Sequence, residues 1–189
     1  MSSKAQNRSR TFRTLVASLA AACSAALLGA CSGPSANDTF SFTAPDGTTF
    51  PPVSDALEIR CGTLDCHGNF YRNMRLFGIY GVRLNTSLVT GRDPTSPDEY
   101  QRNYQSVISI EPENFASIVA NHGQGFDHWV VVLKGTNAEV HKGGQRMKKG
   151  DPTYTCLLSW VTGAVNMDAC NQAVALMPPE PMSTGGTGP

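Results

Sequence analysis

The chain has 189 residues, of which 40% are hydrophobic and 16% charged, and its 15 Lys and Arg balance its 15 Asp and Glu. Four of the basic residues and none of the acidic ones lie within residues 1–30, so the remainder carries a net charge of −4. A nucleic-acid-binding domain would show a basic stripe, so this balance excludes nucleic acid as an expected partner.

The N-terminus has the layout of a secretory signal peptide. Several basic residues precede an apolar run, 15–30, that is too short and too rich in alanine for a lasting membrane span. The run ends in "LGAC", Leu28–Cys31, which resembles the bacterial lipobox, where a lipid is attached to the cysteine and the chain is cut before it. We therefore expect a signal peptide over 1–30 and lipidation of Cys31, with an ordinary signal peptide and an incidental cysteine as the alternative.

A lipidated Cys31 would tether the domain to a membrane outside the cytoplasm, in the cell envelope. Ser32 follows the cysteine, where an aspartate is often associated with retention at the inner membrane. In a cell with an outer membrane, that membrane is the expected destination.

Composition divides the rest of the chain into three parts. Residues 31–49 are rich in Ser, Thr, Gly, Pro and Asp, which is typical of a flexible linker. Residues 173–189 contain a run rich in proline and glycine without apolar periodicity, which predicts a disordered tail. Residues 50–172 are left as one domain with its own core.

The first half of this domain contains two predicted helices. "PPVSDALEIRC" favours a helix that starts near Ser54 and runs into the first cysteine pair. A second helix should begin at Pro97, because Ser96 is a good N-cap and Glu99 completes a capping box.

The second half contains two more predicted helices and one ambiguous segment. A helix is expected over Glu111–His122 with Gly123 as its stop, and the last helix should follow the cap Asp151. The β-branched residues of "HWVVVLKG", 128–135, favour a strand, but the segment is too short to decide. The prediction is a mainly α fold of four helices with no extended sheet.

"RCGTLDCHGNF", 60–70, is the motif with chemical meaning. Covalent haem attachment needs two thiols for the two vinyl groups of the porphyrin and a histidine directly after the second thiol to bind the iron. Cys61, Cys66 and His67 supply this set, although four residues separate the cysteines where the usual C-x-x-C-H spacing has two. Disulfide pairing and a zinc site with a fourth ligand are the alternatives.

The order of short segments around this motif resembles the small cytochrome-c-type domains of bacterial surface and periplasmic proteins, particularly the planctomycete-type cytochrome domain. The resemblance covers residues 50–165 and includes a helix before "CHG", then "GVRL" at 81–84, "EPENFASIV" at 111–119, "HKGGQRM" at 141–147 and "LLSWVTGA" at 157–164. It implies a small cytochrome-c-like helical domain with long loops, flanked by disordered ends, that carries haem c.

The resemblance also implies a distal iron ligand in the loop before the last helix. Met147 is the residue it favours, and His141 in the same segment would give an iron with two histidine ligands and a lower potential. Met177 is a third alternative, and an open iron site a fourth. Arg72 or Arg75 could lie near haem propionates, or simply in solvent.

Cys156 and Cys170 need no haem. They lie fourteen positions apart across the last predicted helix and the turn after it, and a disulfide between them would tie the end of the domain to that helix.

The sequence contains no GxSxG, HExxH or Walker loop, so we do not expect an enzyme. One function left open is a membrane-anchored c-type cytochrome-like lipoprotein that carries single electrons between redox protein partners through covalently attached haem. The other is a disulfide-stapled structural or adhesive cell-envelope lipoprotein without haem, in which Cys61 pairs with Cys66 or with a more distant cysteine.

Overall fold

The structure, a computed structural model, describes residues 42–175, and within this range it is helical with long loops and has no strand. This agrees with the fold class expected from the sequence. The elements in chain order are η1 Gly47–Thr49, α2 Pro51–Cys61, α3 Pro97–Ile108, α4 Pro112–Ala120, η2 Phe126–His128, α5 Val130–Gly135, α6 Pro152–Val161 and α7 Met167–Ala175.

Proline marks the first turn of four helices, where its missing N–H removes no intrahelical bond. The predicted capping box of α3 is present, since the Ser96 side chain accepts from the Glu99 N–H while the Glu99 side chain accepts from the Ser96 N–H. Asp151 caps α6 by accepting from the Tyr154 N–H at 2.9 Å. Local chemistry therefore fixes where these helices begin.

Two segments differ from the prediction. The segment whose residues favoured a strand contains the short helix α5. Trp129, Val131 and Val132 are buried in the core, and this burial outweighs the β propensity of the valines. The helix α6 is not the last, because α7 follows it where a turn was expected. The prediction of four helices was therefore too low.

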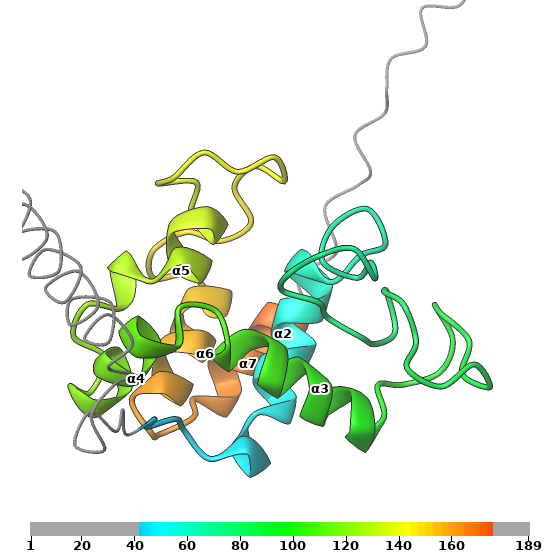
Figure 1. The fold of residues 1–189 in the computed structure, drawn as a ribbon, viewed down its shortest axis with the longest axis horizontal. Helices are drawn as coiled ribbons and strands as arrows, with labels where there is room; N and C mark the ends of the chain where they lie inside the picture. Colours follow the sequence, from blue (N-terminus) through cyan, green and yellow to red (C-terminus); the bar gives the residue numbers. More distant parts are fainter. Residues whose placement is uncertain (1–41, 176–189) are drawn as a thin grey trace, which may run out of the picture. The chain divides into compact units, whose positions relative to one another are not determined.

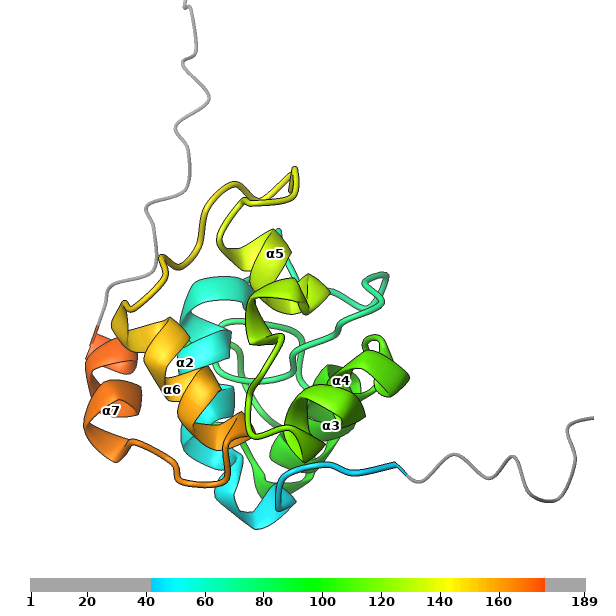
Figure 2. The ribbon, with the colours of Figure 1, turned by 90° about the vertical axis from the view of Figure 1, so that its left-hand side faces the viewer.

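Helix α2 lies at the centre of the core, in contact with α3 on one side and with α6 and α7 on the other (Figures 1 and 2). A cluster of aromatic rings fills the space beside it: the centroids of Phe50 and Trp160 lie 4.9 Å apart, and those of Phe115 and Trp129 lie 4.8 Å apart. The structure contains the disulfide between Cys156 and Cys170 that their spacing predicted. This bridge joins α6 to α7.

A buried polar network connects α2 to α3 and to the loop between them. The Glu58 carboxylate accepts from Ser54 Oγ at 2.9 Å, from Asn103 Nδ2 at 3.1 Å and from Thr95 Oγ1 at 2.6 Å. The side-chain oxygen of Asn103 also accepts from the Phe77 N–H, and its side-chain nitrogen donates to the Phe77 carbonyl. Three segments distant in sequence thus share one carboxylate.

The long loop from Gly62 to Ser96 is held by a buried ion pair. Both carboxylate oxygens of Glu99 accept from the Arg83 guanidinium, at 2.9 and 2.7 Å, and both side chains are almost fully buried. The guanidinium also donates to the carbonyls of Asp93 and Pro94, so nearly all its capacity is used. The loop is therefore fixed although it has no regular secondary structure.

The structure describes a few residues on each side of the predicted domain, 50–172. Pro45, within the predicted linker, is buried and its carbonyl accepts from the Tyr104 hydroxyl at 2.9 Å, while α7 extends through Ala175. The signal peptide, Cys31 and residues 176–189 lie outside the described residues. No helix within 42–175 combines the length and apolar character needed to cross a bilayer.

Candidate functional site

The cysteine motif forms a compact loop at the C-terminal end of α2. Cys61 is the last residue of the helix, and its carbonyl accepts from the His67 N–H at 2.8 Å. Inside this loop the Thr63 carbonyl accepts from the N–H groups of Cys66 and Gly68, at 2.9 and 3.0 Å. The four residues between the cysteines thus form a tight turn, which brings His67 back beside Cys61.

Three glycines allow the loop to close, because the backbones of Gly62, Gly68 and Gly81 cross at one place. A Cβ at Gly68 would lie 2.0 Å from the Gly62 carbonyl oxygen and 2.6 Å from the Cα of Gly81. The Val82 N–H also donates to the Gly68 carbonyl at 2.8 Å. The glycines of "CHG" and "GVRL" therefore have a packing role in the same crossing.

Cys61 and Cys66 are free thiols in the structure, and both are half-buried. Burial raises the pKa of the Cys61 thiol to about 12, and the nearby Cys66 adds to the rise, while Arg146 and Arg60 oppose it. Cys61 is consequently protonated at neutral pH, and it is not a thiolate ligand ready for a metal.

The ring of His67 is held in a defined tautomer. Its Nδ1 lies 2.7 Å from the Met74 carbonyl oxygen, which can only accept, so Nδ1 carries the proton and Nε2 keeps its lone pair. Burial lowers the pKa of His67, the hydrogen bond to the Met74 carbonyl opposes this in part, and His141 and Arg72 lower the pKa further. The ring is therefore the neutral form that binds metals.

His141 is the side chain that the structure brings to His67, across 74 positions of sequence. The two ring centroids lie 6.0 Å apart and the ring planes differ by 20°. His141 Nδ1 lies 3.4 Å from the Gly144 carbonyl oxygen, so this ring also has Nδ1 near a backbone acceptor. Gly143 permits the turn, because a Cβ there would lie 2.8 Å from Cε1 of His141.

The distance between the two rings can be compared with that of two imidazoles bound to one metal. Imidazole nitrogen binds a first-row metal at about 2.0–2.1 Å and lies roughly 1.1 Å from its own ring centroid, which gives two such rings a centroid separation of roughly 6.3 Å. The observed separation is close to this value, and the rings are nearly parallel. With two thiols beside them, the residues present fit the donor set that covalently bound haem requires.

Two contacts fix the loop that carries His141. Arg60, next to Cys61, donates from Nε to the Arg146 carbonyl at 2.7 Å, and the N–H groups of Arg146 and Met147 both donate to the Gly135 carbonyl. The bond from Arg60 connects the loop to the end of α2, and the bonds to the Gly135 carbonyl connect it to the end of α5. No feature of the sequence indicated these long-range contacts.

Met147, the distal ligand that the resemblance favours, belongs to the core. Its side chain is only 2% exposed, and its Cε lies so close to Gly135 that a Cβ there would approach it to 2.2 Å. Its thioether fills the space beside Gly135 of α5, whereas the ring of His141 stacks beside that of His67. Of the two residues considered, His141 is thus the one whose ring lies near that of His67.

The arginines named from the sequence lie in different surroundings. Arg72 remains beside the cysteine loop, where its guanidinium donates to the carbonyls of Cys66 and Asp65 at 3.1 and 3.3 Å. Arg75 instead lies against the rings of Phe70 and Phe77. Of the two, only Arg72 therefore donates to backbone carbonyls of the cysteine loop.

No known protein family, curated protein or solved structure matches this chain.

Within residues 42–175 there is no group of three or more His, Cys, Asp or Glu side chains placed to hold a metal ion, such as a zinc site would need.

Proposed function

We propose that the protein is a membrane-anchored c-type cytochrome-like lipoprotein that carries single electrons between redox protein partners. When bound, haem supplies a one-electron redox couple. Cys61 and Cys66 would hold it through thioether bonds, and the imidazoles of His67 and His141 would bind its iron. The lipid on Cys31 would keep the domain close to membrane partners.

The arrangement of His67 and His141 beside two free thiols is the observation that supports this proposal most. The carbonyl of Met74 orients His67 and keeps its Nε2 available, which is the usual role of a second hydrogen bond to a ligating histidine. The half-buried loop around Cys61 and Cys66 limits contact with water, and it holds the two thiols beside the ring that would bind iron.

Haem staining of a denaturing gel tests the attachment directly. The protein is expressed outside the cytoplasm of a host that matures c-type cytochromes, and covalent haem should survive unfolding whereas coordinated haem is lost. The double variant Cys61→Ser, Cys66→Ser should lose the stain. A colourless wild-type protein in which Cys61 and Cys66 are joined to each other would rule the cytochrome out.

A pair of variants assigns the distal ligand. His141→Ala should keep the covalent stain but open a coordination position, so that carbon monoxide shifts the visible spectrum of the reduced protein. Met147→Leu is the matched variant, because it removes the sulfur and keeps the core volume, and its spectrum should not respond. The opposite result would move the distal ligand to Met147.

The alternative is a structural or adhesive envelope lipoprotein stapled by disulfides, and the bridge between Cys156 and Cys170 favours it as much as it favours the cytochrome. The two functions differ in the state of Cys61 and Cys66. In the structural lipoprotein these cysteines form disulfides, whereas in the cytochrome they bind haem. Peptide mapping without reduction, on the same preparation as the haem stain, distinguishes them.

A further inference from the structure

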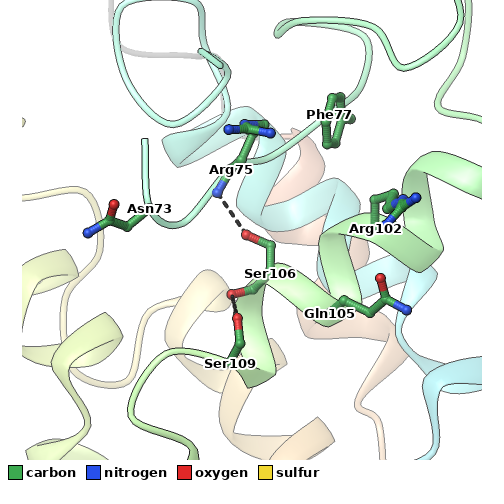
Figure 3. Close-up of a pocket in the computed structure, with 7 residues that line it drawn as sticks. All are labelled: Asn73, Arg75, Phe77, Arg102, Gln105, Ser106 and Ser109. Carbon is green, nitrogen blue, oxygen red and sulfur yellow. Dashed lines mark hydrogen bonds between the residues drawn. The ribbon is translucent and has the colours of Figure 1, made fainter. Parts of the chain in front are cut away.

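A shallow pocket of about 280 Å³ lies between the segment 73–77 and helix α3, outside the site around His67. Figure 3 shows two arginines, Arg75 and Arg102, at its edge, with Ser106, Ser109 and Gln105 along the helix. Phe77 and Asn73 complete the lining, which contains no carboxylate. The pocket is thus rich in hydrogen-bond donors and carries only positive charge.

Arg75 is fixed in position before any ligand arrives. Its guanidinium lies 5.6 Å from the ring centroid of Phe70 and 5.9 Å from that of Phe77, and Nη2 donates to the Phe70 carbonyl. Its Nε is buried and has no hydrogen-bond partner among residues 42–175. Nη2 uses only one of its two hydrogens on the Phe70 carbonyl, so the guanidinium keeps capacity for a further acceptor.

Arg102 and Ser106 add donors from one face of α3. Ser106 Oγ accepts from the Arg75 N–H at 2.7 Å, so its own hydrogen remains available for an acceptor in the pocket (Figure 3). Arg102 is exposed one turn earlier, and within residues 42–175 neither arginine forms an ion pair. Two cations therefore lie at one pocket without a compensating charge.

We propose that this pocket binds a small oxyanion, namely the phosphate or carboxylate group of a solute or of a lipid headgroup. Guanidinium groups match the paired oxygens of these anions and bind them better than they bind chloride. The volume lies just below the usual range for small-molecule sites, which suits a ligand that remains partly in solvent. The proposal does not depend on haem.

Titration of the purified protein with inorganic phosphate at constant ionic strength, against chloride, tests the site. Amide resonances of Arg75, Arg102 and Ser106 should shift saturably. Arg102→Gln should weaken binding about tenfold, since it removes a charged donor. Arg92→Gln is the matched control, because Arg92 is an exposed arginine paired with Asp93 away from the pocket, and it should bind as the wild type does.

Vesicles distinguish the two sources of the anion. Arg102-dependent binding to phosphatidylglycerol but not phosphatidylcholine vesicles would assign the site to a lipid headgroup, and saturable phosphate binding without vesicle binding would assign it to a solute. Absence of both, or phosphate binding that Arg102→Gln leaves unchanged, would overturn the proposal.

Discussion

Glu58 is a carboxylate buried to 2% exposure, and its hydrogen bonds come from neutral groups rather than from a cation. Burial raises its pKa from 4.5 to about 7, and the charge of Asp55 adds to the rise, while the hydrogen bonds from Thr95 and Ser54 oppose it. The folded state therefore holds this proton at a pH where the unfolded chain has lost it.

This proton makes stability depend on pH in a defined direction. Below about pH 4.5 both states are protonated, and the full contribution of Glu58 to stability is present. Between about pH 4.5 and 7 unfolding releases the proton, so the free energy of unfolding falls as the pH rises. The free energy of unfolding loses on the order of 3 kcal/mol in total, and this loss is complete above about pH 7.

We predict that Glu58→Gln, which stays neutral, removes this part of the pH dependence. The difference in unfolding free energy between variant and wild type should move in favour of the variant from pH 4.5 to 8, as measured by urea denaturation. Glu113→Gln changes an exposed carboxylate on α4 and serves as the control. Parallel curves for Glu58→Gln and the wild type would contradict the prediction.

The residues of the candidate site differ in how far the sequence could predict them. Cys61, Cys66 and His67 are adjacent in the chain, so their proximity follows from local spacing. The placement of His141 near His67 and of Met147 in the core could not be predicted that way, because it depends on Arg60 reaching the Arg146 carbonyl and on the space that Gly135 leaves. Those contacts join segments far apart in sequence.

At the scale of elements, helices with a strong start signal were predictable and the others were not. Ser96 and Asp151 cap α3 and α6 as expected, because capping needs only neighbouring residues. In α5, burial of Trp129 and its valine neighbours overrides their β propensity. For α7 a signal existed, since Asn166 Oδ1 accepts from the Ala169 N–H at 3.0 Å, the pattern of an N-cap.

The disulfide between α6 and α7 should contribute much of the stability of the C-terminal part. The double variant Cys156→Ala, Cys170→Ala should lose about 3 kcal/mol, the value expected for a loop of this length. Thermal unfolding followed by circular dichroism should show a melting temperature lower by roughly 10 °C. Dithiothreitol should lower the melting temperature of the wild type and leave that of the variant unchanged; an equal melting temperature for both proteins would count against the bridge.

At the scale of the whole molecule, the proposal places a small domain on a lipid tether. Cys31→Ser should leave an uncut precursor that takes up no labelled fatty acid, because the modified cysteine is both the lipid attachment point and the residue after the cleavage site. Cys23→Ser is the matched control within the apolar run, and it should be cut and labelled normally. Labelling of the Cys31 variant would refute the anchor.

The packing of α2 against α6 and α7 has a consequence for the order of folding. These partners lie about a hundred residues further along the chain, so α2 cannot complete its core until nearly the whole domain has been synthesised, N-terminus first. Cys61 is the last residue of α2, so its thiol stays more open to enzymes and oxidants until this packing is complete.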